Sequence, residues 1–451
     1  MKIGNLILLK ALAVLVAISG SLRSSEIAVS VGPNVRVGQA KSRQAEPYIA
    51  AHPKDANSLI ISTMERLDAV GGGGFTAQAY LSSDAGQTWS ASDLPGLRYA
   101  LRKGQFLTVQ DDWITFAPNG DAYYSALPTT LDRRQPILVF RSIDKGRSWS
   151  GPTEVGAGGF DQPKTTVAFR DGKVRLYLAV STGRGRAVWL VSDDSGKSFK
   201  ALAPIKAGAK PYRALNPLVL ADGSVLLPYS GYLPHSTPRV YVMRSEDGGL
   251  TFQTPVLVPR MDRASQDTLN FAIDLSYGKN RGGIYAAWEE GEFGRNIARE
   301  GDRLARHGIR ARRDVMVAHS TDMGRTWSAA TILRAEGRGP SDLVTMAVSR
   351  DGVVGVLWVQ NERYEVDQRS YDVWFAASAD GGESFCSPLR VSSETSRPAA
   401  GLNPEFSFAS GWGGGDYIGL AASADGSFHA AWIDARDGAF RLYTARIEAR
   451  R

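Results

Sequence analysis

Residues 82–89 read Ser-Ser-Asp-Ala-Gly-Gln-Thr-Trp, and five later stretches repeat the pattern Ser-x-Asp-x-Gly-x-Thr/Ser-Trp/Phe. In such a turn the serine and aspartate side chains bond to the turn's own backbone, glycine supplies a positive φ, and the closing aromatic ring packs inward. We call this pattern the Asp box and predict a structural, non-catalytic role for its aspartates. These are Asp84, Asp144, Asp194, Asp247, Asp322 and Asp380.

The boxes recur at intervals of about one four-stranded unit. Each box follows a strand-like apolar run, such as residues 240–243 or 373–376, and therefore lies at the tip of a β-hairpin. Asn-Gly and Asp-Gly turns join the first two strands of several units. One box alone would be weak evidence, but six in register with hairpins predict an all-β propeller.

The number of units follows from the candidate first strands. There are seven, at residues 48–51, 113–117, 165–169, 218–220, 271–275, 344–348 and 418–422. The last unit, residues 416–447, lacks a fourth strand, and residues 27–37 are assigned to no other unit. We predict one domain over residues 27–451 with seven four-stranded antiparallel blades, six being the alternative. Its N-terminal and C-terminal strands close the ring and remove open sheet edges.

The N-terminus predicts an exported protein. A basic start, an apolar run over residues 11–18 and small residues at 19–21 are typical of a signal peptide over residues 1–21. An uncleaved anchor is the alternative, but the apolar run is short for a bilayer. We expect a periplasmic or extracellular protein, monomeric and without a membrane span once the signal is removed.

Composition argues against several classes of function. The formal net charge of +7 is a mild excess that suits an anionic ligand. The sequence contains no basic motif interleaved with aromatic residues, which is the pattern typical of nucleic-acid binding. We therefore predict that nucleic acid is not a partner. The five histidines lack zinc-ligand spacing and no glycine-rich phosphate loop follows a strand, so we predict no metal and no cofactor.

Strand direction places the loops on two faces of the ring. The Asp boxes and the Asn/Asp-Gly turns share one face, here called the box face. The loops before the first strand and after the second strand of each unit share the opposite face, here called the open face. We predict that any ligand site lies on the open face.

Three units place an arginine next to an acid on the open face, after the second strand. These arginines, Arg66, Arg363 and Arg436, belong to units that become neighbours on ring closure and could converge on a ligand carboxylate. The alternative is that each acid pairs with its own arginine.

Further polar groups on the open face precede the first strands. Two or three carboxylates across a pocket could act as general acid and base, and capping of strand starts is the alternative. His235 also faces this mouth, with a surface histidine of no catalytic role as the alternative. The arginine-rich residues 289–313 predict either a short basic helix over the mouth or a solvated insertion. The polar residues before the first strands are Glu46, Asp111, Asp112, Asp161, Arg213, Asp267, Asp342 and Asp416.

Six Asp boxes on an exported propeller resemble the sialidase (neuraminidase) superfamily, whose boxes are also called BNR repeats. The resemblance implies an exo-acting glycosidase in which three arginines hold the sugar carboxylate. It further implies a tyrosine–glutamate nucleophile pair and an aspartate acid–base near the first blade. By position these roles fall on Tyr364 with Glu290 or Glu362, on Asp112, and on Arg66, Arg363 and Arg436, with Arg213 and His235 as further substrate contacts.

The sequence also departs from that family. Residues 43–47 read Arg-Gln-Ala-Glu-Pro where the family has Phe/Tyr-Arg-Ile-Pro, and seven units replace the usual six. Three functions therefore stay open. The first is a hydrolase of sialic acid or a related carboxylated sugar. The second is a non-enzymatic propeller that binds glycan or protein. The third is a polysaccharide lyase with Tyr364 or His235 as base. The expected partner is an anionic carbohydrate or glycoconjugate.

Overall fold

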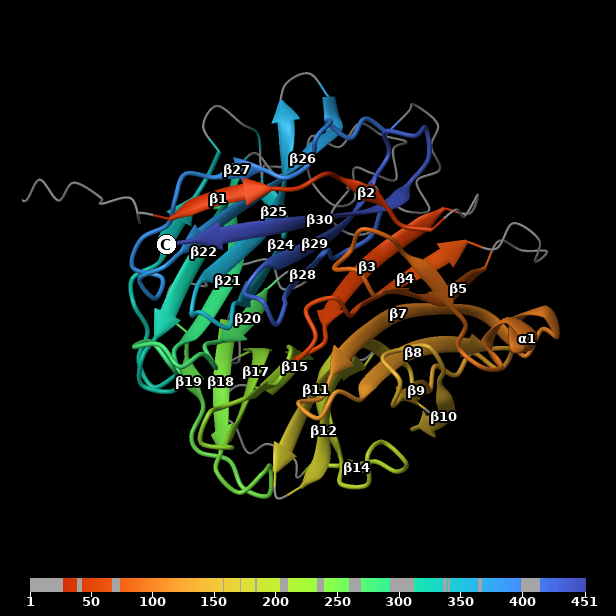
Figure 1. The fold of residues 1–451 in the computed structure, drawn as a ribbon. Helices are drawn as coiled ribbons and strands as arrows, with labels where there is room; N and C mark the ends of the chain where they lie inside the picture. The colour runs from red at the N-terminus through yellow and green to blue at the C-terminus, as the bar shows by residue number, and fades with distance from the viewer. Residues whose placement is uncertain are drawn as a thin grey trace, which may run out of the picture.

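The computed structural model describes residues 27–38, 43–66, 74–156, 158–170, 172–182, 185–202, 210–232, 239–258, 269–292, 312–335, 339, 341–363, 367–398 and 414–451. These residues form seven antiparallel sheets arranged as the blades of a ring (Figure 1). The predicted seven-bladed β-propeller is confirmed over the six-bladed alternative. The predicted signal, residues 1–21, lies outside the described residues, as does most of the predicted basic helix.

Each of the first four blades runs in chain order from an inner strand beside the central channel to a strand at the rim. Blade 4 has a divided inner strand, because β15 and β16 both pair with β17. Their strands are β3 (Gln44–Ala51), β4 (Leu59–Arg66), β5 (Phe75–Ser82) and β6 (Ser90–Ser92); β7 (Phe106–Phe116), β8 (Ala122–Thr130), β9 (Ile137–Ser142) and β10 (Ser150–Val155); β11 (Phe160–Arg170), β12 (Lys173–Thr182), β13 (Arg186–Ser192) and β14 (Lys200–Ala201); β15 (Lys210–Ala214), β16 (Leu218–Val219), β17 (Val225–Tyr232), β18 (Arg239–Ser245) and β19 (Val256–Leu257).

Blades 5 and 6 follow the same order, and blade 7 takes its outer strands from the N-terminus. Helix α1 (Leu97–Arg102) lies between blades 1 and 2, and no helix of the described residues combines the length and hydropathy needed to cross a bilayer. The strands are β20 (Asn270–Ile273), β21 (Ile284–Glu292), β22 (Arg312–Ser320) and β23 (Thr331–Leu333); β24 (Ser341–Val348), β25 (Val354–Arg363), β26 (Asp367–Ser378) and β27 (Leu389–Arg390); β28 (Gly419–Ala422), β29 (Phe428–Asp434), β30 (Arg441–Arg450), β1 (Ala28–Val31) and β2 (Val35–Arg36).

The ring is closed by the two ends of the chain. Strand β1 pairs antiparallel with β30 in a register from Ala28 opposite Arg450 to Val31 opposite Ile447, and β2 also pairs with β30. Figure 1 shows β1 in red beside β30 in dark blue. The predicted closure by N-terminal and C-terminal strands is confirmed, and blade 7 therefore has its fourth strand.

The Asp boxes are networks of short hydrogen bonds. In the first box the Gly86 amide donates to Ser82 Oγ at 2.9 Å, Ser82 Oγ donates to Asp84 Oδ1 at 2.7 Å, and the Thr88 amide donates to Asp84 Oδ1 at 2.9 Å. The other five boxes repeat these bonds. Burial raises the pKa of Asp194, but hydrogen bonds from Ser198 and Ser192 outweigh it and lower the pKa to about 2.

The boxes also tie each blade to its neighbour. The Gly146 backbone in the blade 2 box has φ 84° and lies against Ile60 of blade 1, so close that an added Cβ would be 2.7 Å from Ile60 Cδ1. The Trp149 indole of the same box donates to Ser92 Oγ of blade 1 at 3.0 Å. A side chain at the glycine position would be strained by the positive φ and would displace the end of the Ile60 side chain.

We expect Asp380→Ala to lower the free energy of unfolding by about 1–2 kcal/mol, because it removes bonds from Ser378 Oγ, Ser384 Oγ and the Ser384 amide. The matched control, Glu383→Ala in the same box, removes a side chain that is 71% exposed and should change stability by less than about 0.5 kcal/mol. Thermal and denaturant unfolding measure both. Equal effects of the two variants would contradict the structural role of the box.

Candidate functional site

The inner strands carry an unusual backbone conformation near the open face. Four non-glycine residues there adopt a left-handed conformation with φ of 50–54°, and each sits at a shift in register between the first two strands of its blade. Such bulges turn side chains in a new direction and carry a conformational cost. In blades 1, 2 and 3 these residues are polar, and in blade 6 the residue is apolar. They are Glu46, Asp111, Gln162 and Leu343.

Four acidic residues lie next to one another across blades 7, 1, 2 and 3. The Asp416 amide donates to Glu46 Oε1 at 3.3 Å, and the Asp111 and Asp161 carboxyl groups are hydrogen-bonded to each other. Asp111 Oδ2 also accepts a bond from the Gln162 amide at 3.2 Å. We call Glu46, Asp111, Asp161 and Asp416 the carboxylate arc. The structure thus brings together four of the acidic residues that the sequence places before the first strands.

Burial and mutual repulsion favour protonation of the arc. Burial, followed by the negative charge of Asp161, raises the pKa of Asp111 to about 7. Burial and the charges of Asp111 and Asp416 raise the pKa of Glu46 well above its usual value. Asp111 is partly exposed, so its carboxyl group can exchange a proton with a ligand near neutral pH.

A tyrosine from blade 7 completes this group. The Tyr417 hydroxyl donates to the Asp112 backbone oxygen at 3.4 Å and is within hydrogen-bonding range of the Glu46 carboxyl. Burial and the charges of Glu46, Asp111 and Asp112 raise the pKa of Tyr417 well above its usual value. Sequence analysis missed this tyrosine, although it directly follows Asp416 at the start of an inner strand.

Asp112, which the sequence puts forward as the acid–base, lies below the arc in the interior of blade 2. Its side chain is fully buried, and the Tyr124 hydroxyl donates to Asp112 Oδ2. Asp112 Oδ1 has no partner among the described residues. Burial raises the pKa of Asp112 to about 8. The catalytic role stays a prediction, with Asp111 as the neighbour that faces the open end.

Two cations flank the arc on the side of blades 3 and 4. Arg213 NH2 lies 3.1 Å from Asp161 Oδ2, and the Arg213 side chain is largely buried. Lys164 is 7% exposed, and burial together with the charge of Arg213 lowers its pKa to about 7. The open face therefore carries acidic groups and basic groups side by side.

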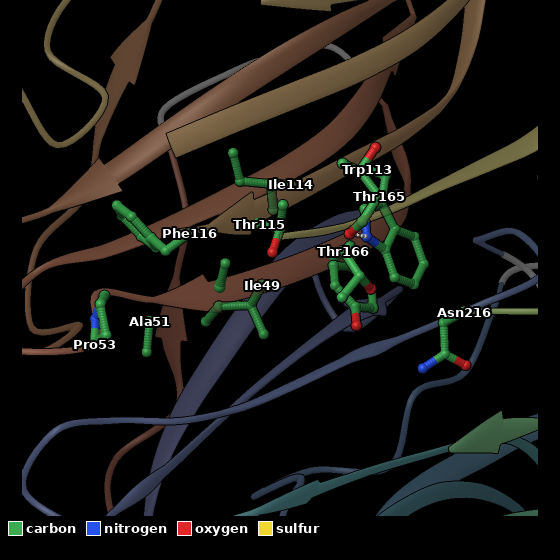
Figure 2. Close-up of a pocket in the computed structure, with 12 residues that line it drawn as sticks. Ile49, Ala51, Pro53, Trp113, Ile114, Thr115, Phe116, Thr165, Thr166 and Asn216 are labelled. Carbon is green, nitrogen blue, oxygen red and sulfur yellow. Dashed lines mark hydrogen bonds between the residues drawn. The ribbon is translucent and has the colours of Figure 1, made fainter. Parts of the chain in front are cut away.

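The channel below the arc contains two cavities that share Tyr48, Trp113 and Asn216 as lining residues. The larger, about 220 Å³, lies toward the box face. Figure 2 shows Trp113 and Asn216 at one end of it and Pro53 and Phe116 at the other. The smaller, about 20 Å³, lies toward the open face against Lys164 and Tyr417. Tyr48 stacks on Trp113 with ring centroids 3.6 Å apart, and this ring pair borders both cavities.

Among the three arginines predicted to converge on a ligand carboxylate, Arg436 has a defined set of contacts. Its guanidinium lies 2.6 Å from Asp434 Oδ2, bonds to Ser393 and Asn34, and stacks over Tyr443. These contacts join blade 7 to the loops beside it, and none of them reaches the carboxylate arc. Arg66 ends β4, and Arg363 ends β25 with a side chain outside the described residues. Convergence of the three arginines stays a prediction.

The Glu290 carboxylate accepts a hydrogen bond from a buried tryptophan. The Trp288 indole donates to Glu290 Oε2 at 3.3 Å, and blades 6 and 7 repeat the arrangement with Trp358 to Gln360 and Trp432 to Asp434. The catalytic role of Glu290 stays a prediction. Tyr364, His235, Asp267 and the Glu362 side chain lie outside the described residues.

The described residues show no group of three or more His, Cys, Asp or Glu side chains placed to hold a metal ion. The raised pKa of Asp111 suits the carboxylate arc to proton transfer, and the Tyr417 phenol lies beside it.

These features define a class: a seven-bladed propeller whose open face carries carboxylic acids, a tyrosine and basic side chains. The chain belongs to the BNR repeat-like domain family, whose match covers residues 122–429. The resemblance to sialidase-type BNR propellers is thereby confirmed. No curated protein matches the chain.

Solved structures that are similar to this chain include the following three. A Dyadobacter fermentans protein of unknown function is 15% identical with a TM-score of 0.48, over 94% of this chain and 99% of that one. A Penicillium chrysogenum α-L-arabinanase is 14% identical with a TM-score of 0.47, over 77% of this chain and 98% of the arabinanase chain. A Hadza microbial sialidase is 16% identical with a TM-score of 0.46, over 77% of this chain and 66% of the sialidase chain.

The raised pKa of Asp112 gives a pH-dependent stability. The folded state keeps a proton that the unfolded state releases above about pH 4, so this group lowers the free energy of unfolding as pH rises from about 4 to about 8. Asp112→Asn should remove part of that slope, by up to about 1.4 kcal/mol per pH unit. Denaturant unfolding across this range measures it. The control Asp93→Asn changes a carboxylate that is 77% exposed, and a matching loss of slope there would contradict the assignment.

Proposed function

We propose that the chain is an exo-acting, sialidase-like glycoside hydrolase that cleaves sialic acid or a related carboxylated sugar at the open face. The observation that carries the proposal is the grouping of Tyr417, Glu46 and Asp111 at the seam of blades 7, 1 and 2. The resemblance to sialidases implies a tyrosine paired with a glutamate and an aspartate acid–base, and these three side chains supply that set.

The proposed reaction starts from the form of the site in which Asp111 is protonated and Glu46 is ionised. Tyr417 Oη attacks the anomeric carbon while the Glu46 carboxylate, which its raised pKa makes a stronger base, accepts the phenolic proton. Asp111 gives its proton to the glycosidic oxygen, and the bond between that oxygen and the anomeric carbon breaks. A water molecule then attacks the same carbon and gives a proton to Asp111. The bond to Tyr417 breaks as Tyr417 recovers its proton from Glu46.

The electrostatics of the arc support the assignment of Asp111 as proton donor. Its pKa of about 7 keeps a large protonated fraction at neutral pH, and its hydrogen bond to Asp161 fixes the carboxyl group. Asp161 in turn is paired with Arg213 at 3.1 Å. Environments that separate the behaviour of neighbouring carboxyl groups are typical of acid–base sites.

The proposal places the sugar carboxylate on the basic side of the site. Arg213 is the arginine nearest the arc, and Arg66, Arg363 and Arg436 remain the candidates from the sequence. Paired N–H donors make arginine suited to a carboxylate.

A monomeric, exported protein is part of the same proposal. The N-terminal residue of protein recovered outside the cytoplasm tests the cleavage after residue 21.

Two observations favour binding without hydrolysis as the second candidate. Arg436 is committed to Asp434, Ser393 and Asn34, and residues 43–47 lack the family's Arg-Ile-Pro segment. A propeller of this kind would bind sialosides or uronic-acid glycans without turnover. Release of an unsaturated sugar would instead point to a lyase.

We expect purified protein to release the fluorescent aglycone of a sialoside, and Tyr417→Phe to reduce kcat/KM by at least about 100-fold because the nucleophile is lost. The matched control is Tyr277→Phe, whose side chain is 97% exposed in a turn on the box face and should keep full activity. Thermal unfolding shows whether both variants fold. No turnover by the wild type on sialosides or uronic-acid glycans would overturn the hydrolase proposal.

Asp111 should also set the alkaline limit of activity. The donor must be protonated, so kcat/KM of the wild type should fall as pH rises through about 7. Asp111→Asn should lose about 100-fold or more in rate and lose this alkaline limb. Asp351→Asn, with a side chain 63% exposed, is the control. A wild-type rate that stays constant well above pH 7 would exclude Asp111 as the donor.

A further inference from the structure

The smaller cavity of the channel lies at the propeller axis, where all seven blades contribute to its lining. Its volume is about 20 Å³, and blades 3, 4, 5 and 6 each place one amine, amide or aliphatic hydroxyl side chain on it. A cavity needs about 10–15 Å³ to hold one water molecule, so this one accepts a single water-sized particle and no sugar. These four side chains are Lys164, Asn216, Asn270 and Thr345, and the lining also includes the aromatic residues Tyr48, Trp113 and Tyr417.

Lys164 in this lining is a buried cation without a counter-charge in contact. Its side chain is 93% removed from solvent, and it makes no hydrogen bond or ion pair within the described part of the chain. Buried ammonium groups in proteins are almost always paired, because an unpaired charge is costly to remove from water. Burial lowers the pKa of Lys164 to about 7, and an anion in the adjacent cavity would keep this amine protonated.

The neighbouring carboxylates are engaged elsewhere. Asp161 is held by Arg213 at 3.1 Å, and Asp111 binds both Asp161 and the Gln162 amide. Arg213, the nearest other cation, adds a second positive charge on the same side of the channel. The carboxylates act on Lys164 through space but do not touch it.

The other polar groups of the lining include several donors, and one of its amide oxygens, Asn216 Oδ1, already accepts from the Phe271 amide at 3.4 Å. The Asn216 amide nitrogen donates one hydrogen to the Phe271 oxygen at 2.9 Å, and the Asn270 amide nitrogen donates one to Thr345 Oγ1 at 3.4 Å. Each amide nitrogen carries a second hydrogen, and the Thr345 hydroxyl carries one of its own. An ammonium group with three further N–H and O–H donors favours an anion over a cation.

We propose that this cavity is a binding site for a single halide ion, chloride in the natural setting, held by the Lys164 ammonium and the side-chain donors of Asn216, Asn270 and Thr345. A substrate carboxylate has three heavy atoms attached to a sugar and exceeds the space. The bound ion pairs the buried charge and links four blades at the axis. The site does not depend on the proposed hydrolase activity.

The first test is thermal unfolding of the full chain at constant ionic strength, with sodium chloride replacing sodium isethionate, whose anion is too large for the cavity. We expect the wild-type Tm to rise by about 1–4 °C and to saturate with chloride concentration, because the ion binds the folded state. Lys164→Met should lose this rise. Lys210→Met, which removes an exposed lysine from the neighbouring blade, should keep it.

The second test needs no variant and covers the case in which Lys164→Met does not fold. Crystals of the wild type grown in sodium bromide should show an anomalous peak within hydrogen-bonding distance of Lys164 Nζ. A flat or non-saturating chloride response in the wild type, an unchanged response in Lys164→Met, or crystals with no bromide at Nζ would each overturn the site.

Discussion

The pairing of β1 with β30 is the constraint on which the rest of the molecule depends. Blades 7 and 1 are separated by almost the whole chain, and this antiparallel register of four residue pairs brings them side by side. Backbone bonds across the seam reinforce it, including Glu46 N to the Gly414 oxygen at 2.8 Å and Gln44 N to the Phe440 oxygen at 3.1 Å. Tyr417 of blade 7 meets Glu46 of blade 1 across this seam. An opened ring would separate the tyrosine from its glutamate while leaving each blade intact.

The carboxylate arc shows how the fold tolerates a cluster of like charges. Glu46 is buried and Asp111 is partly exposed, and both are held in a left-handed backbone conformation, which most residues other than glycine avoid. Their raised pKa values mean that the folded state keeps protons on groups that would otherwise repel one another. The arrangement therefore lowers stability at alkaline pH and at the same time stores acidic protons at the mouth of the channel. Such a balance is more typical of functional sites than of structural ones.

The same bulges explain what could and could not be predicted from the sequence. The repeat of boxes and hairpins was sufficient for the seven blades and their closure, because both depend on local turns and strand number. The starts of the inner strands were predicted too late: β3 begins at Gln44, β7 at Phe106 and β11 at Phe160, several residues before the predicted starts. Each bulge inserts a residue and breaks the alternation that identifies a strand. The carboxylate arc lies at these breaks, so its contacts across blades had no signature in the sequence.

A second repeat, Trp-x-Glu/Gln/Asp, includes Glu290, which the sequence suggested as catalytic. Side chains two residues apart share one face of a strand, so the buried indoles of Trp288, Trp358 and Trp432 each find an acceptor at that distance. Gln360 serves as well as an acid, so the indole bond does not require a negative charge. Where the acceptor is Asp434, the charge is matched by Arg436 at 2.6 Å. An acid beside an arginine after the second strand can thus arise from tryptophan burial alone, which separates this structural pairing from the arc on the inner strands.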